Sequence, residues 1–301
     1  MANRYWVGGT AAWDGTAGSK WSLTSGGAGG QAVPTSADDV FFDAASGAVT
    51  VSIPSTANCL SLTCTGFTGT ITGAGSILDY GNLTLAAGMT WSHSGNVQFP
   101  ATSGSFTITS AGKTLASVVI QTTTATYTLG DALTCSGLLS ISSGTFTTNN
   151  FNVTCGTSFG SSSTTTRTLN LGSSTISVGT VISLDTRALT FNAGTSQFNL
   201  TGSSGGITVS VVAGQPTGVT FYNVAFTSNT TATKNITGVN VFNNLSVTAP
   251  ASAGVMQITF DSPQTINGTL STTSTAGNRR VWFRGVTYGI AQTLTINSAP
   301  S

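Results

Sequence analysis

The sequence predicts an all-β protein, and within that class it favours a β-solenoid (β-helix). Three observations lead to this prediction: strand- and turn-forming residues dominate the composition, apolar residues alternate along short segments, and similar segments recur every 20 to 22 residues. Solenoids are built from repeats of this kind, because each repeat buries its apolar face against its neighbours.

The composition restricts the class of protein. The 301 residues include 56 Thr, 39 Ser and 37 Gly, which favour strands and turns, and no Glu. Only 6% of the residues are charged, whereas about 25% is typical. A hydrophobic content of 39% and a net charge of +1 oppose disorder. The neutral balance also gives no electrostatic reason to expect a nucleic acid as partner.

The repeats show which residues should stack on one another. Apolar residues match apolar residues, and turn residues match turn residues, in three pairs of segments: Leu169–Val178 with Phe191–Leu200, Phe221–Phe226 with Phe242–Val247, and Ser103–Thr107 with Ser143–Thr147. The offsets are 22, 21 and 40 residues, the last being close to two repeats. A Greek-key sandwich would show similar strand lengths, but the fixed offset favours the solenoid.

From residue 46 onward, alternation of apolar and polar residues predicts strands with one buried face. In chain order these segments are 49–53, 60–64, 83–85, 106–108, 139–141, 169–171, 176–178, 198–200, 207–211, 242–247, 258–260 and 294–296. We expect Leu, Ile, Val and Phe to point inward, among them Phe191, Phe198, Phe221 and Phe242. Residues 46–301 would then form about a dozen turns, and the C-terminal turn would continue or be covered by a partner.

Residues 1–45 differ from the rest and predict an N-terminal cap or attachment module. They contain Trp6, Trp13 and Trp21, half of the Asp residues and a Gly-rich run. The first turn of a solenoid exposes strand edges and apolar side chains, which such aromatic residues could cover. The alternative is that the aromatic residues bind a sugar or a partner protein.

A second unusual segment lies near the C-terminus, where Arg279, Arg280, Trp282 and Arg284 occur within six residues. Two interpretations remain open: an edge strand protected by charge, or a binding surface, where Arg and Trp are often enriched. Together with the three N-terminal tryptophans, these residues form the candidate interaction surface.

Candidate catalytic and metal-binding residues are sparse. Many β-helices degrade polysaccharides with paired carboxylates, but beyond residue 45 the only acids are Asp79, Asp131, Asp185 and Asp261, without a common spacing. His93, the single histidine, lies in a polar segment and is expected to be solvated. We therefore predict no enzymatic activity, no cofactor and no metal site.

Four cysteines, Cys59, Cys64, Cys135 and Cys155, are too few and too scattered for a disulfide scaffold. Cys135 and Cys155 lie 20 residues apart, and each follows the apolar parity of its strand. We expect these two thiols to be buried, close together and reduced.

Two groups of residues carry a resemblance to a known family. The opening Arg4–Thr10 with Trp13-Asp14, followed by Val33–Asp43, resembles the N-terminus of large β-solenoid proteins of tailed bacteriophages and related bacterial surface proteins. Leu189–Ser196 and Thr220–Val224 are similar to the internal repeats of that family.

The resemblance implies a non-enzymatic virion protein, a fibre, spike or capsid decoration that acts as a rigid rod and binds other virion proteins. It also implies a homo-oligomer, often a trimer, and it carries over no catalytic residue. The sequence shows no signal peptide and no stretch long enough for membrane insertion, so we expect a virion protein assembled in the host cytoplasm. The alternatives are an adhesin on the bacterial surface that binds a host-surface glycan and, less favoured, a polysaccharide depolymerase.

Overall fold

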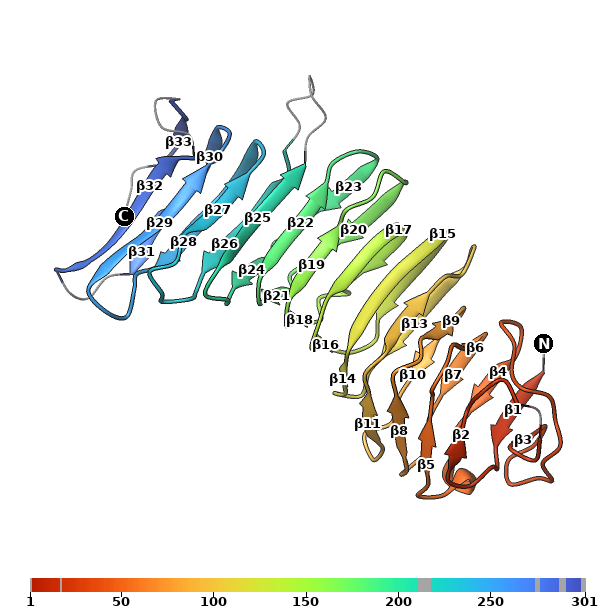
Figure 1. Ribbon diagram of the computed structural model, residues 1–301. Helices are drawn as coiled ribbons and strands as arrows, with labels where there is room; N and C mark the ends of the chain where they lie inside the picture. The colour runs from red at the N-terminus through yellow and green to blue at the C-terminus, as the bar shows by residue number, and fades with distance from the viewer. Residues whose placement is uncertain (1, 17, 211–217, 274–276, 287–290, 299–301) are drawn as a thin grey trace. The chain divides into compact units, whose positions relative to one another are not determined.

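The computed structural model describes residues 2–16, 18–210, 218–273, 277–286 and 291–298 (Figure 1). The chain forms two compact units, unit 1 (residues 1–147) and unit 2 (residues 148–301). Both consist of stacked β-solenoid turns, about 11 in all. The one helix in the described residues is a short 3-10 turn, η1 (Ala44–Ser46). None of the described residues belongs to a helix with the length and hydrophobicity needed to span a membrane.

Unit 1 has three strands in most of its turns. Its strands are β1 (Asn3–Trp6), β2 (Ala11–Ala12), β3 (Trp21–Ser22), β4 (Asp39–Phe41), β5 (Thr50–Ser52), β6 (Ala57–Cys59), β7 (Ser61–Thr63), β8 (Thr70–Gly73), β9 (Ile77–Asp79), β10 (Leu83–Thr84), β11 (Thr90–His93), β12 (Asn96–Phe99), β13 (Ser105–Thr109), β14 (Thr114–Leu115), β15 (Ser117–Leu129), β16 (Leu133–Cys135) and β17 (Leu139–Thr147). Corresponding strands of successive turns pair in parallel, as in β5 with β8 and β8 with β11.

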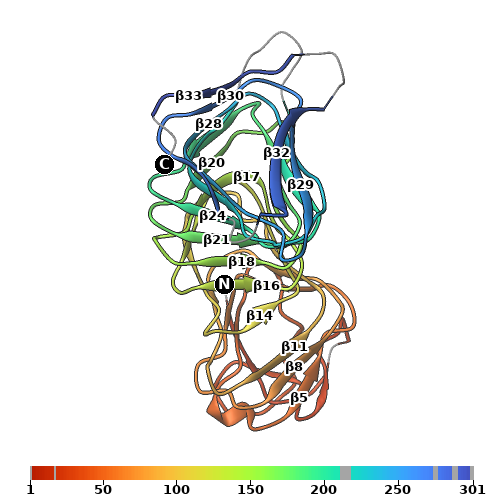
Figure 2. The ribbon, with the colours of Figure 1, turned by 90° about the vertical axis from the view of Figure 1, so that its left-hand side faces the viewer.

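Unit 2 continues the same architecture, with β21 and β24 side by side (Figure 2). Its strands are β18 (Val153–Cys155), β19 (Ser158–Ser161), β20 (Arg167–Asn170), β21 (Thr175–Val178), β22 (Val181–Asp185), β23 (Leu189–Asn192), β24 (Gln197–Leu200), β25 (Gly205–Ser210), β26 (Thr220–Phe226), β27 (Lys234–Thr237), β28 (Asn240–Thr248), β29 (Gly254–Phe260), β30 (Gln264–Ile266), β31 (Leu270–Thr273), β32 (Arg279–Gly285) and β33 (Leu294–Ile296).

The strand register confirms the repeats found in the sequence. Ile176 pairs with Phe198 across β21 and β24, and Phe221 pairs with Phe242 across β26 and β28. The 40-residue offset is also confirmed, because Tyr127 lies between its two members, Phe106 and Phe146, in the ladder of β13, β15 and β17. The described pairings are parallel except that of β1 with β3, which excludes the Greek-key sandwich.

The repeated Gly-Ser/Thr-Ser turn has a steric explanation. Gly172 and Gly194 both have positive φ angles, of 54° and 59°, which glycine adopts at little cost. The two turns also stack closely, since a Cβ at Gly194 would lie 2.4 Å from the carbonyl oxygen of Gly172. Position 194 therefore requires glycine, and the positive φ angle of Gly172 favours it.

Aromatic side chains fill the first turn of unit 1, as the predicted cap requires. Trp6, Trp13 and Trp21 are at most 1% exposed, and the ring of Trp21 lies 5.0 Å from that of Trp6 and 5.3 Å from that of Trp13. Phe42 contacts all three. The segment is also hydrogen-bonded to the next turn, because β4 pairs with β7. The boundary predicted at residues 45 and 46 stays a prediction.

Phenylalanine rings pack against one another in the interior of unit 2 and form an aromatic cluster among aliphatic side chains. Phe198, Phe221 and Phe242 are fully buried, as expected, and the rings of Phe221 and Phe242 stack at 5.6 Å. Phe191 differs from the expectation, because it is only half-buried, although its ring lies against those of Phe198 and Phe221.

Replacing Phe198 tests the contribution of this aromatic cluster to stability. Phe198→Ala removes a ring that contacts three other phenylalanines and should lower the free energy of unfolding by about 3–5 kcal/mol. Thr190→Ala is the matched control, since Thr190 is exposed on β23 and its loss should change stability by less than about 0.5 kcal/mol. Denaturant unfolding monitored by circular dichroism measures both, and equal effects would contradict the assigned core.

Candidate functional site

The residues of the candidate interaction surface lie in two different environments. Trp6, Trp13 and Trp21 are buried in the cap of unit 1, so they present no ring to a sugar or protein. For these three residues the expectation of an interaction surface is therefore corrected: their apolar area is used to cover the end of the solenoid.

The basic segment near the C-terminus is arranged differently. Alternation along β32 places Arg280, Trp282 and Arg284 on one face of the strand, and all three are exposed. Trp282 is 50% exposed. Their role in binding stays a prediction, and we call these three residues the β32 face.

The register with β29 fixes which side of the sheet the β32 face occupies. Val281 and Phe283 pair with the buried Met256 and Ile258, and the ring of Phe283 stacks 6.1 Å from that of Phe260. The residues between them therefore point away from the core. Among the described residues, no carboxylate forms an ion pair with Arg280 or Arg284.

Two open hollows lie beside β32. One, of about 280 Å³, is lined by Arg279 together with Asn229, Thr248, Ala249, Pro250, Ala251 and Thr273. The other, of about 190 Å³, is lined by Arg284 together with Phe260, Phe283, Gly285, Gln292 and Leu294. Each hollow thus has one arginine in its wall.

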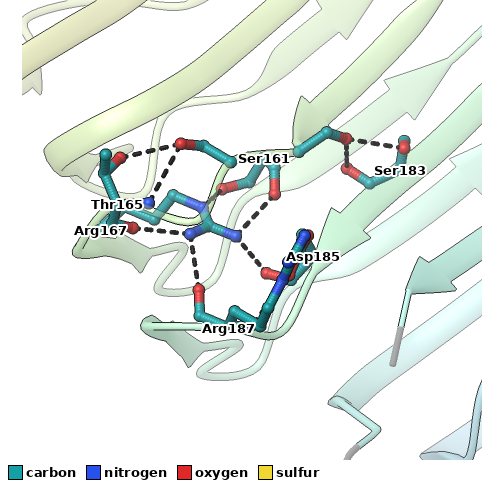
Figure 3. A network of polar contacts seen from close by, with 8 residues as sticks. Ser161, Thr165, Arg167, Ser183, Asp185 and Arg187 are labelled. Carbon is teal, nitrogen blue, oxygen red and sulfur yellow. Dashed lines mark hydrogen bonds and ion pairs between the residues drawn. The ribbon is translucent and has the colours of Figure 1, made fainter. Parts of the chain in front are cut away.

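Sequence reasoning missed a buried polar network around Arg167, which lies at the start of β20 and is 1% exposed (Figure 3). Its Nη1 donates to the carbonyl oxygens of Thr165 and Arg187, at 2.7 and 2.8 Å. Its Nη2 donates to those of Ser161 and Asp185, and its Nε donates to Ser161 Oγ at 2.6 Å. Burial lowers the pKa of Arg167, but an arginine stays charged in proteins.

This network has a structural role. A backbone carbonyl group that is buried without a donor costs free energy. The Arg167 guanidinium donates to four carbonyl oxygens at the corner of two successive turns, and two of these, of Ser161 and Asp185, belong to buried residues. Lys234 acts in the same way, since its buried Nζ donates to the carbonyl oxygens of Gly202 and Ser203 at 2.6 and 2.7 Å.

The four aspartates beyond residue 45 also bind backbone groups. Asp79 accepts a hydrogen bond from the backbone N–H of Gly81. Asp185 accepts one from the backbone N–H of Arg187 and also forms an ion pair with the Arg187 side chain. Asp131 accepts from two N–H groups of the preceding turn, and Asp261 accepts from one. The hydrogen bonds to Arg187 hold the pKa of Asp185 below its usual value.

Asp79 differs from the other three in the burial of its carboxyl group. It is fully buried in unit 1, and its Oδ2 has no hydrogen-bond partner. Burial raises its pKa to about 8 and, together with the nearby carboxyl group, raises the pKa of Tyr127 and of Cys64. Asp79 is therefore largely protonated at neutral pH.

His93 corrects another expectation, because it is 3% exposed rather than solvated. Its Nε2 lies 2.7 Å from the carbonyl oxygen of Gly75, which makes Nε2 the donor and leaves Nδ1 unprotonated. Burial lowers the pKa of His93. The ring packs edge-on against Trp91, with centroids 5.4 Å apart.

All four cysteines are buried, which confirms that part of the prediction for Cys135 and Cys155. These two residues belong to different units, so their proximity stays a prediction. In the described part of the chain, no three His, Cys or Asp side chains are grouped as metal ligands would be.

Comparison of the chain with protein-family models, with curated proteins and with solved structures finds no match. The function must therefore be argued from the residues and from their geometry.

The buried carboxyl group of Asp79 predicts a pH dependence of stability. A pKa of about 8 in the folded state lies above the unfolded value of about 4, so the folded state binds the extra proton between these values. Stability should be highest near pH 4 and should fall by up to about 1.4 kcal/mol per pH unit as the pH rises to 8. Asp79→Asn mimics the neutral acid and should remove this fall.

Urea unfolding of both proteins between pH 4 and pH 9 measures the effect. The difference in unfolding free energy between Asp79→Asn and the native protein should grow with pH and level off above pH 8, because other titrating groups cancel in that difference. If the unfolding free energies of the two proteins change in parallel with pH, Asp79 is not buried as described.

A pair of arginine variants tests the corner network. Arg167→Met keeps much of the apolar stem but removes the side-chain donor to four carbonyl groups, two of them in buried residues, so the free energy of unfolding should fall by about 3 kcal/mol. Arg187→Met removes an exposed side chain that binds only Asp185 and should cost much less. Thermal unfolding of both variants measures the difference, and equal losses would contradict the structural role of Arg167.

Proposed function

We propose that this chain is a non-enzymatic structural protein of a virion, a fibre, spike or capsid decoration in which solenoid turns act as a rigid spacer. The observation that carries the proposal is the in-register parallel pairing of successive turns over an apolar core within each unit. Such a core resists bending, because any bend opens several strand pairs together. The resemblance of residues 4–14 and 33–43 to phage solenoid proteins supports the same role.

The use of the charged side chains supports a structural role. Each Asp beyond residue 45 binds backbone N–H groups, and Arg167 and Lys234 bind backbone carbonyls. These groups stabilise turns, and they are not gathered around a substrate-sized cleft in the described residues. We propose other virion proteins and further copies of the chain as its partners.

A second candidate, a carbohydrate-binding adhesin at the bacterial surface, is favoured by one observation. Trp282 is half exposed between two arginines on the β32 face. An exposed aromatic ring with charged neighbours on a rigid sheet is suited to ligand binding.

Particle association tests the first proposal. Antibodies against the chain should detect it in particles purified from the host culture by density-gradient centrifugation. With so few surface charges, attachment should depend on apolar contacts and should survive a high-salt wash. Recovery from the host cell envelope with none in the particles would favour the adhesin, and recovery as free soluble protein alone would contradict both.

Deleting residues 1–45 should unfold unit 1, because the deletion removes β4, which pairs with β7, and three tryptophans that fill the first turn. A loss of attachment in such a variant would therefore not identify the attachment site.

The enzymatic alternative is tested by incubating the chain with host glycans and measuring the release of reducing ends. A release that is lost in Asp131→Asn or Asp185→Asn would contradict the non-enzymatic proposal.

A further inference from the structure

The charged residues are unevenly divided between the two units. Unit 1 contains six Asp and three Lys or Arg, whereas unit 2 contains two Asp and six Lys or Arg. Among the cations of unit 2, Arg167 and Lys234 bind backbone carbonyl groups, and Arg187 pairs with Asp185. The other three are all on β32: Arg279, which also has an interaction partner, and the two arginines of the β32 face.

The β32 face has a regular geometry. Alternate residues of a parallel strand lie about 6.6 Å apart, so the Cα atoms of Arg280 and Arg284 are about 13 Å apart, with Trp282 between them. The strand is held along its whole length by β29, through seven paired residues. The three side chains therefore project from a rigid support, in a row parallel to the strand.

The residues in register with this row carry no charge. Val255 pairs with Arg280, Gln257 with Trp282 and Thr259 with Arg284. Thr259 is 3% exposed, and its hydroxyl donates to the side chain of Asn235. The nearest acid along the chain, Asp261, is engaged with the backbone N–H of Gly238. An anion at the β32 face would thus meet no carboxylate from these neighbours.

We propose that the β32 face binds the carboxylate groups of an acidic polysaccharide. Arg280 and Arg284 each offer a planar fork of donors that matches a carboxylate, and an acidic polysaccharide repeats this group along its chain. The indole face of Trp282 would pack against the C–H face of the sugar between them. The proposal concerns a ligand of this face and does not depend on the virion role.

A single-stranded nucleic acid is the main competitor, because arginine also binds phosphate and indole also stacks on bases. Sites of that kind combine a charged groove with successive aromatic platforms. The β32 face offers one ring between two arginines and no second aromatic platform in its row. The row therefore fits an acidic glycan better.

Binding of oligogalacturonate to the full chain, measured by isothermal titration calorimetry, tests the proposal. The fully methyl-esterified oligosaccharide is the matched ligand, since it keeps the sugar rings and loses the charge. The acidic form should bind, and more weakly as salt rises, whereas the ester should bind at least about tenfold more weakly, because charge-assisted hydrogen bonds are lost.

Variants assign the binding to the face. Arg284→Ala and Trp282→Ala should each weaken binding about tenfold, and Arg284→Lys should weaken it less. Lys113→Ala removes one positive charge from unit 1 and should leave affinity unchanged. Circular dichroism of every variant should match the native protein, because these side chains point outward.

Three outcomes would overturn the proposal. The first is equal affinity of the chain for the acidic and the methyl-esterified oligosaccharide. The second is an equal loss of affinity in Lys113→Ala and Arg284→Ala. The third is the absence of binding at millimolar concentrations of the acidic oligosaccharide. Tighter binding of a single-stranded oligonucleotide, lost in the same two β32 variants, would also overturn it and would assign the face to nucleic acid.

Discussion

The stacking of like residues on like residues, imposed by in-register parallel strands, is the constraint on which the rest of each unit depends. In unit 2, Ile176, Phe198, Val224 and Leu245 occupy one column because each strand pairs in register with the next. A slip of one residue would exchange the buried and exposed faces of a whole strand. The apolar parity of each repeat therefore fixes the register, and the register in turn brings the turn glycines into contact.

The same constraint explains how the few charged residues are used. Backbone groups within strands are paired by the neighbouring turns, and several backbone groups at strand ends and corners also take donors or acceptors from side chains. A guanidinium at Arg167, an ammonium at Lys234 and the carboxylates of Asp131 and Asp185 supply them. The low charge of this chain thus fits a fold in which Thr, Ser and Asn can line the outside, while several of the ionic groups stabilise corners.

The sequence predicts the fold well because residues that lie one repeat apart in the sequence are paired with each other in the strand register. The offsets of 21 and 22 residues correspond to the pairs Phe221 with Phe242 and Ile176 with Phe198. It predicts side-chain environments less well. His93 is buried because it follows the inward parity of β11, a signal that its polar neighbours obscured. The burial of Trp6, Trp13 and Trp21 depends on the way residues 3–46 fold over the first turn, which no local pattern reveals.

A solenoid separates its inner and outer faces, and this separation decides where function can arise. Inward positions such as Phe198 are constrained by both neighbouring turns, whereas outward positions such as Thr190 contact little beyond their own sheet. An outward row can therefore change composition without disturbing the core. On β32, Val281 and Phe283 keep the inward pattern while the intervening positions hold two arginines and a tryptophan. The apolar core does not require these three side chains, so their concentration on one strand is the reason for proposing a ligand at the β32 face.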